Sequence, residues 1–188
     1  MAEKTLSDNS PPSESFSRGL VQIFTGDGRG KTSAALGTVL RALGHGLRVY
    51  IVFFMKDDYV YGERNILSNL PNVTMVSFGQ REFVDPTNIK PKEIELARQA
   101  LAAAREAVFN GNYDLVVLDE ANIAVAWKMV ALDEMLSLIR DKPQNVELIL
   151  TGRQADAELV KSADLVTEML KIKHHYDKKV LARKGIDY

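Results

Sequence analysis

The sequence contains no cysteine among its 188 residues. A chain without cysteine cannot build a disulfide scaffold, bind zinc or an iron–sulfur cluster through thiolates, or use a cysteine nucleophile. It also lacks any apolar run near the roughly 18–20 residues of a membrane-spanning helix. The first twenty residues lack the apolar block of a signal peptide, so we expect a cytoplasmic protein that does not bind a membrane.

Neither sign of charge is in large excess, because 24 basic and 25 acidic residues leave a formal net charge of −1. Such a chain has no overall basic field to attract nucleic acid, which we therefore exclude as a partner. Hydrophobic residues make up 46% and charged residues 26%, close to the globular average, which excludes wholesale disorder. The length suits one domain, or one domain with a tail.

Residues 1–18 differ from the rest because they are rich in serine, proline and charged side chains. Leu6 and Phe16 are their only large apolar residues apart from Met1. We predict a flexible tail over residues 1–18 and one folded domain over residues 19–188. The alternative is a segment that orders over a ligand or a partner subunit, with Phe16 as its anchor.

Short apolar runs alternate with helical patterns from Gly19 onward. Strands are predicted where β-branched and aromatic residues cluster, at Leu20–Thr25, Arg48–Phe54, Val73–Phe78, Leu115–Leu118 and Val146–Leu150, with an extended segment at Leu165–Lys171. Helices are predicted between them, at Lys31–Leu43, Lys92–Asn110, Ala131–Arg140 and Ala155–Ala163. This order predicts an α/β fold, a mostly parallel central sheet with helices on both faces.

A glycine-rich loop, Thr-Gly-Asp-Gly-Arg-Gly-Lys-Thr over residues 25–32, joins the first strand to the first helix. Its glycines let successive N–H groups point into one hollow, and the helix N-terminus and Lys31 add positive charge. Thr32 places a hydroxyl where a magnesium ligand is needed. The strict phosphate-loop pattern begins with glycine, whereas this loop begins with Thr25, and the alternative is a turn without a ligand. We predict a nucleoside triphosphate bound by Thr25, Gly26, Asp27, Gly28, Arg29, Gly30, Lys31, Thr32 and Ser33.

Asp119 and Glu120 follow a buried strand, as the loop and Thr151-Gly152-Arg153 follow two others. Because parallel strands end at one edge of a sheet, we expect these three motifs to lie together there. The carboxylates of Asp119 and Glu120 are suited to hold Mg²⁺ opposite Thr32. These motifs predict a nucleoside triphosphate and magnesium, but they do not define the reaction.

Further segments narrow the function, namely Arg41–Gly46, Gly62–Asn65, Thr151–Arg153, Ile172–Asp177 and Gly185–Tyr188. With the phosphate loop and Asp119-Glu120, in this order, they resemble the P-loop ATP:corrinoid adenosyltransferases over about residues 20–188. The Gly-Glu-Arg-Asn segment and the terminal Lys-His…Gly-Ile-Asp-Tyr are the distinguishing motifs, since the phosphate loop alone is unspecific.

The resemblance implies a RecA-like P-loop fold, a homodimer, and a flavoprotein or flavodoxin as reductant. It implies transfer of the 5′-deoxyadenosyl group from ATP to the cobalt(I) of a corrinoid, either cobalamin or a precursor, in adenosylcobalamin biosynthesis or salvage. Triphosphate leaves, and ATP lies reversed in the loop compared with ordinary P-loop ATPases. Two alternatives remain: a P-loop hydrolase or switch, and a carrier without catalysis.

Cobalt(I) is a strong nucleophile, so the reaction needs no side-chain base. What remains is alignment and stabilisation of the charge that grows on triphosphate. Lys31 is the candidate catalytic residue for that task, with Arg41 as a further contact. Arg153 is a candidate contact for ATP, and its alternative is a surface salt bridge.

The aromatic Gly-Phe-x-Trp segment of the best-known members corresponds roughly to Phe78–Phe83, where the tryptophan is missing. Phe83 is the candidate to displace the lower axial ligand of cobalt, and packing at a strand end is the alternative. We expect Phe78 and Trp127 to pack in the core. His174 and His175 are adjacent, so on an extended chain they would face opposite ways, and a shared metal site is not expected.

Overall fold

The computed structural model describes residues 17–57 and 61–187, so most of the predicted tail, including Phe16, lies outside the described residues. The elements follow in the order β1 (Val21–Thr25), α1 (Lys31–Gly44), β2 (Val49–Phe54), α2 (Gly62–Leu67), β3 (Val73–Phe78), α3 (Pro91–Phe109), β4 (Leu115–Asp119), α4 (Ala121–Ala126), α5 (Leu132–Asp141), β5 (Glu147–Thr151), α6 (Ala157–Ser162), β6 (Leu165–Glu168) and a 3-10 helix (His175–Lys178).

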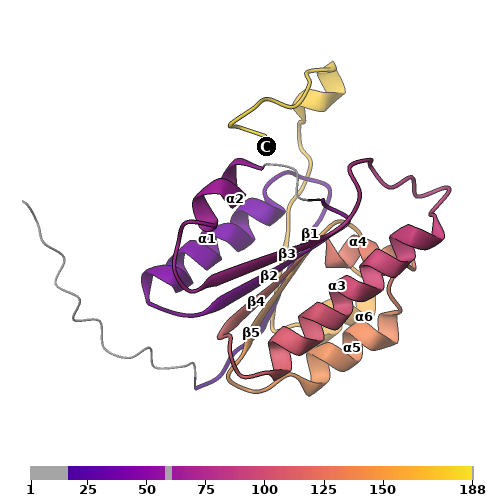
Figure 1. Ribbon diagram of the computed structural model, residues 1–188. Helices are drawn as coiled ribbons and strands as arrows, with labels where there is room; N and C mark the ends of the chain where they lie inside the picture. The colour runs from indigo at the N-terminus through magenta and orange to yellow at the C-terminus, as the bar shows by residue number, and fades with distance from the viewer. Residues whose placement is uncertain (1–16, 58–60, 188) are drawn as a thin grey trace, which may run out of the picture.

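The strands form one six-stranded sheet in the order β3-β2-β4-β5-β1-β6 within the described residues (Figure 1). Every neighbouring pair is parallel; Ile51 of β2, for example, lies opposite Val117 of β4. The predicted α/β class with a parallel central sheet is confirmed. Because all strands run the same way, their carboxyl ends share one edge, where β2, β4, β5 and β1 are consecutive neighbours.

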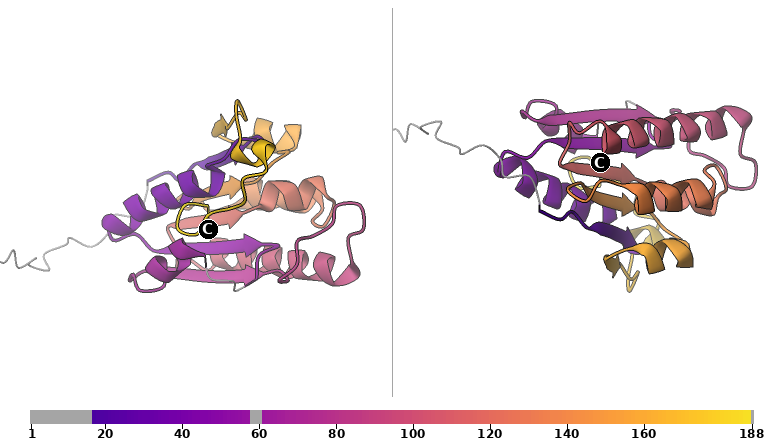
Figure 2. Two further views of the ribbon diagram at one scale, coloured as in Figure 1. Left: turned by 90° about the horizontal axis from the view of Figure 1, so that it is seen from above. Right: turned by 90° about the horizontal axis from the view of Figure 1, so that it is seen from below.

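Two hydrophobic layers enclose the sheet, because alternate residues of its strands point to opposite faces. In β2, Val52 packs into the layer under α3, α4 and α5, whereas Ile51 packs into the layer under α1 and α2. Viewed from above, α1 and α2 lie in front of the sheet, and viewed from below α3 and α5 do (Figure 2). The prediction of helices on both faces is therefore confirmed.

The ends of α3 follow the predicted chemistry. Pro91 occupies the first turn, where its missing N–H costs nothing, and the Lys90 N–H donates to Glu93 at 2.6 Å. Gly111 follows the helix with a φ of 74°, a left-handed conformation that glycine adopts without strain. At 19 residues α3 is long, yet no helix in the described part of the chain is both long and apolar enough to cross a membrane.

The short helices α2 and α4 and the 3-10 helix were not predicted. Each spans only four to six residues, too few for a helical period to show in the sequence. The structure also begins β1 at Val21 and β5 at Glu147, one residue later than predicted. These differences leave the order of strands and long helices as the sequence indicates.

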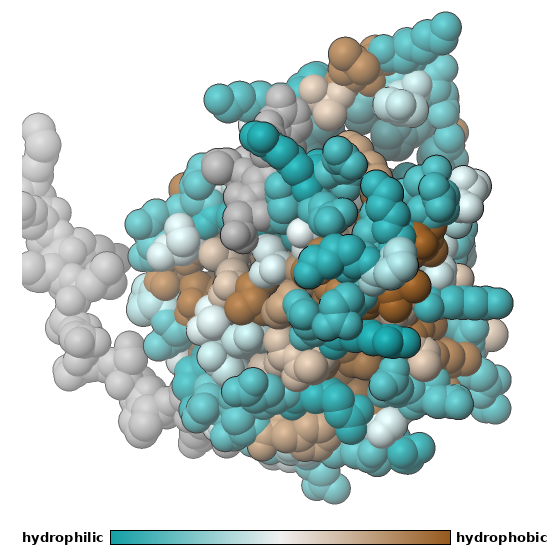
Figure 3. All heavy atoms as spheres, turned by 45° about the vertical axis from the view of Figure 1, so that its right-hand side comes forward, coloured by the Kyte–Doolittle hydropathy of each residue, from teal (hydrophilic) through white to brown (hydrophobic). Residues whose placement is uncertain are grey.

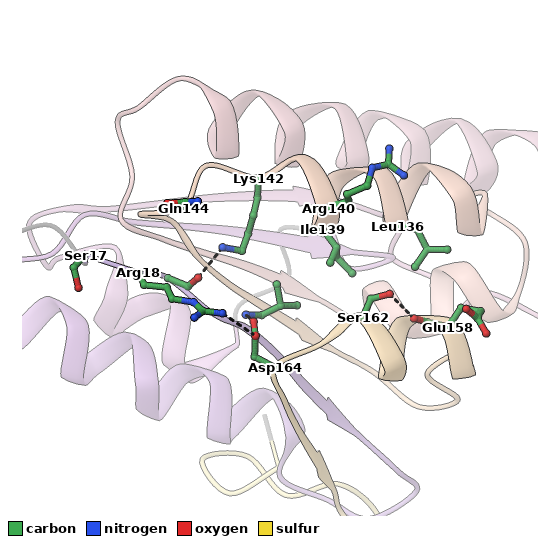
Figure 4. Close-up of a pocket in the computed structure, with 12 residues that line it drawn as sticks. Ser17, Arg18, Leu136, Ile139, Arg140, Lys142, Gln144, Glu158, Ser162 and Asp164 are labelled. Carbon is green, nitrogen blue, oxygen red and sulfur yellow. Dashed lines mark hydrogen bonds and ion pairs between the residues drawn. The ribbon is translucent and has the colours of Figure 1, made fainter.

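A hollow at the amino edge of the sheet lies between the start of β1 and helices α5 and α6 (Figure 4). Lys142 reaches across it and donates to the carbonyl oxygens of Gly19 at 2.8 Å and Val146 at 2.9 Å. Arg18 approaches Asp164 at 3.9 Å. The Lys142 hydrogen bonds and the Arg18–Asp164 ion pair fasten the start of the folded domain at the edge of the sheet opposite the predicted site.

Candidate active site

Three motifs that are distant in sequence meet at the carboxyl edge of the sheet. The hydroxyl groups of Thr32 and Thr151 both donate to Asp119 Oδ1, at 2.8 and 2.7 Å. Asp27 of the loop and Arg153 after β5 approach each other at 3.7 Å. The prediction that the loop, Asp119-Glu120 and Thr151–Arg153 converge is therefore confirmed.

The glycines of the loop are required by close packing against Met169, just past β6. The Gly28 N–H donates to the Met169 carbonyl at 2.6 Å. A Cβ atom at Gly26 would lie 2.5 Å from that carbonyl oxygen, and one at Gly28 would lie 2.6 Å from it. Gly26 and Gly30 also have φ values of 92° and 118°, in the left-handed region. The glycines of this loop, which depart from the strict phosphate-loop pattern, thus lie where the loop packs closely against the end of β6.

Lys31 lies inside this loop, only 9% exposed. Its Nζ donates to the carbonyl oxygens of Gly26 at 2.8 Å and Gly28 at 2.7 Å. Burial lowers the pKa of Lys31, while the facing carboxylates, Glu120 foremost, oppose that shift. The ammonium therefore lies within the loop that was predicted to hold phosphate, at the N-terminus of α1.

Asp119 is 1% exposed and all of its charge is matched inside the protein. One oxygen accepts from Thr32 and Thr151, and the other lies 2.5 Å from Lys56 Nζ. Burial alone would raise the pKa of Asp119, but Lys56 and the hydroxyl groups outweigh it and hold the pKa below its usual value. Asp119 is therefore ionised and rigidly placed.

Glu120 turns its backbone into the left-handed region, with a φ of 64°, as the chain passes from β4 to α4. Its N–H donates to Thr151 Oγ1 at 3.0 Å, and its side chain lines the hollow beside the loop. Burial, and then repulsion from Asp119, raise the pKa of Glu120. The two carboxylates thus share one site and repel each other unless a cation lies between or beside them.

Thr32, Asp119 and Glu120 present only oxygen atoms, which are the donors that Mg²⁺ prefers. Within residues 17–57 and 61–187, no group of three or more acidic or histidine side chains is arranged to hold a metal ion. Mg²⁺ in nucleotide sites commonly takes one or two carboxylates and completes its shell with water and phosphate oxygens. The residues present fit that kind of site.

Lys56 is the main residue that the sequence analysis missed. It follows β2 at the same edge of the sheet, and it lines the hollow as well as pairing with Asp119. Burial alone would lower the pKa of Lys56, but Asp119 and Glu120 raise it above its ordinary value. The sequence could have indicated Lys56 as a site residue, because it is the first charged residue after a strand that ends at this edge.

The hollow between these residues has a volume of about 580 Å³. The predicted residues that line it lie in the loop, at the start of α1, at the end of β4 and after β5: Asp27, Gly28, Arg29, Gly30, Lys31, Thr32, Ser33, Glu120 and Arg153. Thr25, Gly26 and Asp119 lie behind them and support the wall; Thr25 Oγ1, for example, accepts from the Ala155 N–H at 3.2 Å.

Arg41 does not itself line this hollow, although Leu40 directly before it does. It lies in the last turn of α1, exposed, ten residues after Lys31 and so about 15 Å along the helix axis. That Arg41 contributes positive charge to the triphosphate stays a prediction.

The C-terminal segment returns to the phosphate loop and forms one wall of the hollow (Figure 1). Arg29 pairs with Asp187 at 3.0 Å and also donates to the Ile186 carbonyl. Asp187 in turn accepts from the Nε of Arg183 at 3.0 Å. Hydrogen bonds from Arg183 hold the pKa of Asp187 at about 2. The terminal Gly-Ile-Asp motif is thus joined to the nucleotide loop.

Phe78 and Phe83, the aromatic residues between β3 and α3, differ in burial. Phe78 packs against the core, as expected. Phe83 is 97% exposed, so the packing alternative is wrong for it in this structure. Trp127 also packs against the core, which confirms the expectation from sequence.

Arg64 of the Gly-Glu-Arg-Asn segment lies over the Phe53 ring, 4.0 Å from its centroid, and so holds the start of α2 against the sheet.

The expectation that His174 and His175 face opposite ways is wrong. Their rings stack with centroids 4.5 Å apart, because the chain enters a 3-10 helix at His175 and is not extended there. His174 Nδ1 accepts from the Tyr176 N–H at 3.2 Å. His175 lies 3.9 Å from Asp187, the residue that pairs with Arg29 of the phosphate loop.

Comparison with known proteins adds a second line of evidence. Residues 17–188 match the family described as ATP:corrinoid adenosyltransferase BtuR/CobO/CobP. The chain is 34% identical to the corrinoid adenosyltransferase of Escherichia coli strain K12 over 171 residues, which cover 91% of this chain and 86% of that protein. It is also 34% identical to the corrinoid adenosyltransferase of Pseudomonas aeruginosa, covering 91% of this chain and 84% of that one.

A solved structure supports the fold independently. The flagellar accessory protein FlaH from Methanocaldococcus jannaschii superimposes with a TM-score of 0.56 over 80% of this chain and 71% of FlaH. The sequence identity is 14%, so this likeness concerns the fold alone. It agrees with the predicted RecA-like P-loop architecture.

Proposed function

The chain belongs to the ATP:corrinoid adenosyltransferase family and is an enzyme that transfers the adenosyl group of ATP to a corrinoid, and on that premise we propose how its own residues take part. The observation that carries the proposal is the convergence of Lys31, Thr32 and Glu120 at one hollow, with Asp119 bonded to Thr32 behind its wall. The hollow is lined by the phosphate loop, by Lys31, which is mostly buried, and by the Glu120 carboxylate. That combination suits the triphosphate end of ATP, with the reacting ribose carbon held toward the open side.

Thr32, Asp119 and Glu120 would hold Mg²⁺ in this proposal, and the bound ion would supply positive charge to the triphosphate. Lys31 would exchange its bonds to the carbonyl oxygens of Gly26 and Gly28 for bonds to phosphate oxygens. Arg153 faces the same hollow from the end of β5 and is the further phosphate contact. Its pairing with exposed Asp27 at 3.7 Å is loose enough for Arg153 to turn to a ligand.

The reaction that we propose requires no proton transfer by a side chain. The cobalt(I) centre of the corrinoid supplies an electron pair to the ribose C5′ atom, the C5′–O bond breaks, and triphosphate leaves with the electrons of that bond. The protein aligns the two substrates and stabilises the charge that gathers on the leaving group. Lys31 is therefore the residue whose charge matters most in the transition state.

Phe83 is proposed to act on the corrinoid side. It follows β3, whose end lies at the same edge of the sheet as the loop, and its ring is almost fully exposed. An exposed phenyl ring is available to pack against the lower face of a corrinoid and exclude the lower axial ligand and water from cobalt. This role replaces that of the tryptophan which the best-known members carry in this segment.

A homodimer is proposed from the surface of β6 and the C-terminal segment. In the described part of the chain β6 pairs only with β1, so its outer edge is open. Apolar side chains reach the surface here, including Leu165, Leu170 and Ile172. In Figure 3 the projecting part at the top of the view carries one brown patch within a mostly teal surface. Open edges and clustered apolar residues favour association. The flavin-containing reductant and the cytoplasmic location stay predictions.

Anaerobic incubation with ATP, Mg²⁺ and chemically reduced corrinoid tests the reaction. We expect a cobalt–carbon bond by absorbance and one intact triphosphate per adenosyl group transferred. ADP with phosphate and no cobalt–carbon bond would instead assign the hollow to nucleotide hydrolysis. Binding of ATP and corrinoid without any product would show that the protein is a carrier and not an enzyme. Magnesium dependence is then measured by omitting the metal and adding a chelator.

A further inference from the structure

We propose that Lys56 is a second triphosphate-binding lysine of this site and that, before substrate arrives, its ammonium occupies the divalent cation's place on Asp119. This inference rests on the proposed function, because it assumes that triphosphate and a metal share the hollow. It goes beyond it by assigning a role to a residue outside the phosphate loop and by giving the order in which cations occupy Asp119.

The contacts of Asp119 leave one oxygen for a cation. Oδ1 already accepts from the hydroxyl groups of Thr32 and Thr151, which fills its two lone pairs. Oδ2 accepts from Lys56 Nζ at 2.5 Å. A metal ion that binds Asp119 while these hydroxyl contacts persist must therefore take the position next to Oδ2. Lys56 holds one of the two acceptor positions of Oδ2 in this structure, and a cation at this oxygen lies beside the ammonium and repels it.

The charge balance explains why a lysine lies there. Asp119 and Glu120 are adjacent carboxylates in a buried setting, where an unpaired negative charge is costly. Lys56 supplies the compensating charge, with its side chain 19% exposed. A divalent cation supplies twice that charge at the same oxygen and repels the ammonium. Lys56 is then free of its partner and needs another anion.

The surroundings of Lys56 direct it to the nucleotide. Lys56 and Lys31 line the same hollow, one after β2 and the other at the start of α1. The rings of Phe53 and Tyr61 lie 5.7 and 5.4 Å from Lys56 Nζ, so the displaced ammonium keeps favourable aromatic contacts as it turns. A triphosphate bound in this hollow would present its negative charge to both lysines. Lys56 thus neutralises Asp119 in the empty site and triphosphate in the filled one.

The test measures ligand binding, so that it does not depend on turnover. Full-length wild type, Lys56→Met and Lys56→Gln are titrated with Mn²⁺ alone by electron paramagnetic resonance. The same proteins are titrated with inorganic triphosphate at saturating Mg²⁺, and with adenosine alone, by calorimetry. Lys161→Met is the matched control, because Lys161 is an exposed lysine of α6 paired with Glu158. Melting temperatures establish which variants are folded, and either folded Lys56 variant suffices.

We expect Lys56→Met to bind Mn²⁺ about tenfold more tightly, because the ion no longer competes with an ammonium for Oδ2. Triphosphate should bind about tenfold or more weakly, the usual effect of losing one charged hydrogen bond. Adenosine affinity should stay unchanged, and Lys161→Met should match wild type in all titrations. Lys56→Arg keeps the charge and should restore most of the triphosphate affinity.

Several results would overturn the proposal. Unchanged Mn²⁺ affinity would show that Lys56 does not occupy the metal's place, and unchanged triphosphate affinity would show that it does not turn to the ligand. A lowered melting temperature with both affinities unchanged would reduce Lys56 to a structural partner of Asp119. If wild type itself bound neither triphosphate nor Mn²⁺, the proposed function would fail as well, which separates the two cases.

Discussion

Thr32 and Asp119 are 87 residues apart in the chain, yet the Thr32 hydroxyl donates to Asp119 Oδ1 at 2.8 Å. The contact joins the first turn of α1 to the end of β4 across the carboxyl edge of the sheet. It places the proposed metal ligands before any ligand arrives. A site built in this way is preorganised, so the cost of ordering it has been met during folding.

Thr32→Ala and Glu120→Ala should each raise the Mg²⁺ concentration needed for half-maximal activity. Each substitution removes one oxygen donor from a site whose remaining ligands stay in place. The measurement is initial rate against free Mg²⁺ at saturating ATP, with circular dichroism to confirm the fold. Magnesium curves that superimpose on wild type for both variants would refute the metal assignment.

Lys31→Ala should abolish adenosyl transfer. Losing a hydrogen bond to a charged group costs about 1.5–3 kcal/mol in ordinary settings, and the loss is greater where charge develops in the transition state. The decrease in kcat should therefore be at least about tenfold. A variant with near wild-type kcat and KM for ATP would show that this loop does not hold the leaving group.

Phe83→Ala should separate reduction from transfer. Activity should be lost when cobalt(II) corrinoid is reduced by a mild biological reductant, and mostly kept when cobalt(I) is supplied by strong chemical reduction. The physical reason is that a ring covering the lower face eases reduction and adds little once cobalt(I) exists.

The 97% exposure of Phe83 gives this experiment a stability control. Truncating an exposed side chain should change the free energy of unfolding by less than about 0.5 kcal/mol. The melting temperature of Phe83→Ala should therefore match wild type. Equal losses in both assays, or no loss in either, would remove Phe83 from the reduction step.

Asp114→Asn should lower thermal stability at pH 7, and the deficit should shrink as the pH falls. Asp114 accepts hydrogen bonds from Arg48 Nε at 3.1 Å, from Arg48 Nη2 at 2.9 Å and from the Arg48 main-chain N–H at 2.8 Å. Hydrogen bonds from the Arg48 side chain hold the pKa of Asp114 below its usual value. Arg48 is partly exposed, so the cost is about 1–2 kcal/mol.

The sign follows from the lowered pKa of Asp114. Its ionised form is stabilised by folding, so the contribution is complete above the unfolded pKa of about 4 and is lost as the pH falls through the folded value. Melting curves of wild type and variant between about pH 3 and pH 7 should therefore converge at the acid end. A difference that stayed constant across this range would show that the stabilisation is not electrostatic.

The sequence by itself determined the local structure and the ligand class. β-Branched runs and glycine stops placed the strands and long helices, because these patterns act over neighbouring residues. The loop of residues 25–32 indicated a phosphate site because its glycines, Lys31 and Thr32 are close together in the sequence. The parallel arrangement then predicted that Asp119 and Arg153 would reach the same edge.

Only the tertiary structure decided which side chains meet at that edge and which remain apart. The strand order places β2 beside β4, and this brings Lys56 to Asp119. A 3-10 turn stacks His174 on His175. The physical reason is that these contacts join segments far apart in sequence or depend on a local turn too short to leave a periodic pattern. Their distances are fixed by packing, which no local pattern encodes.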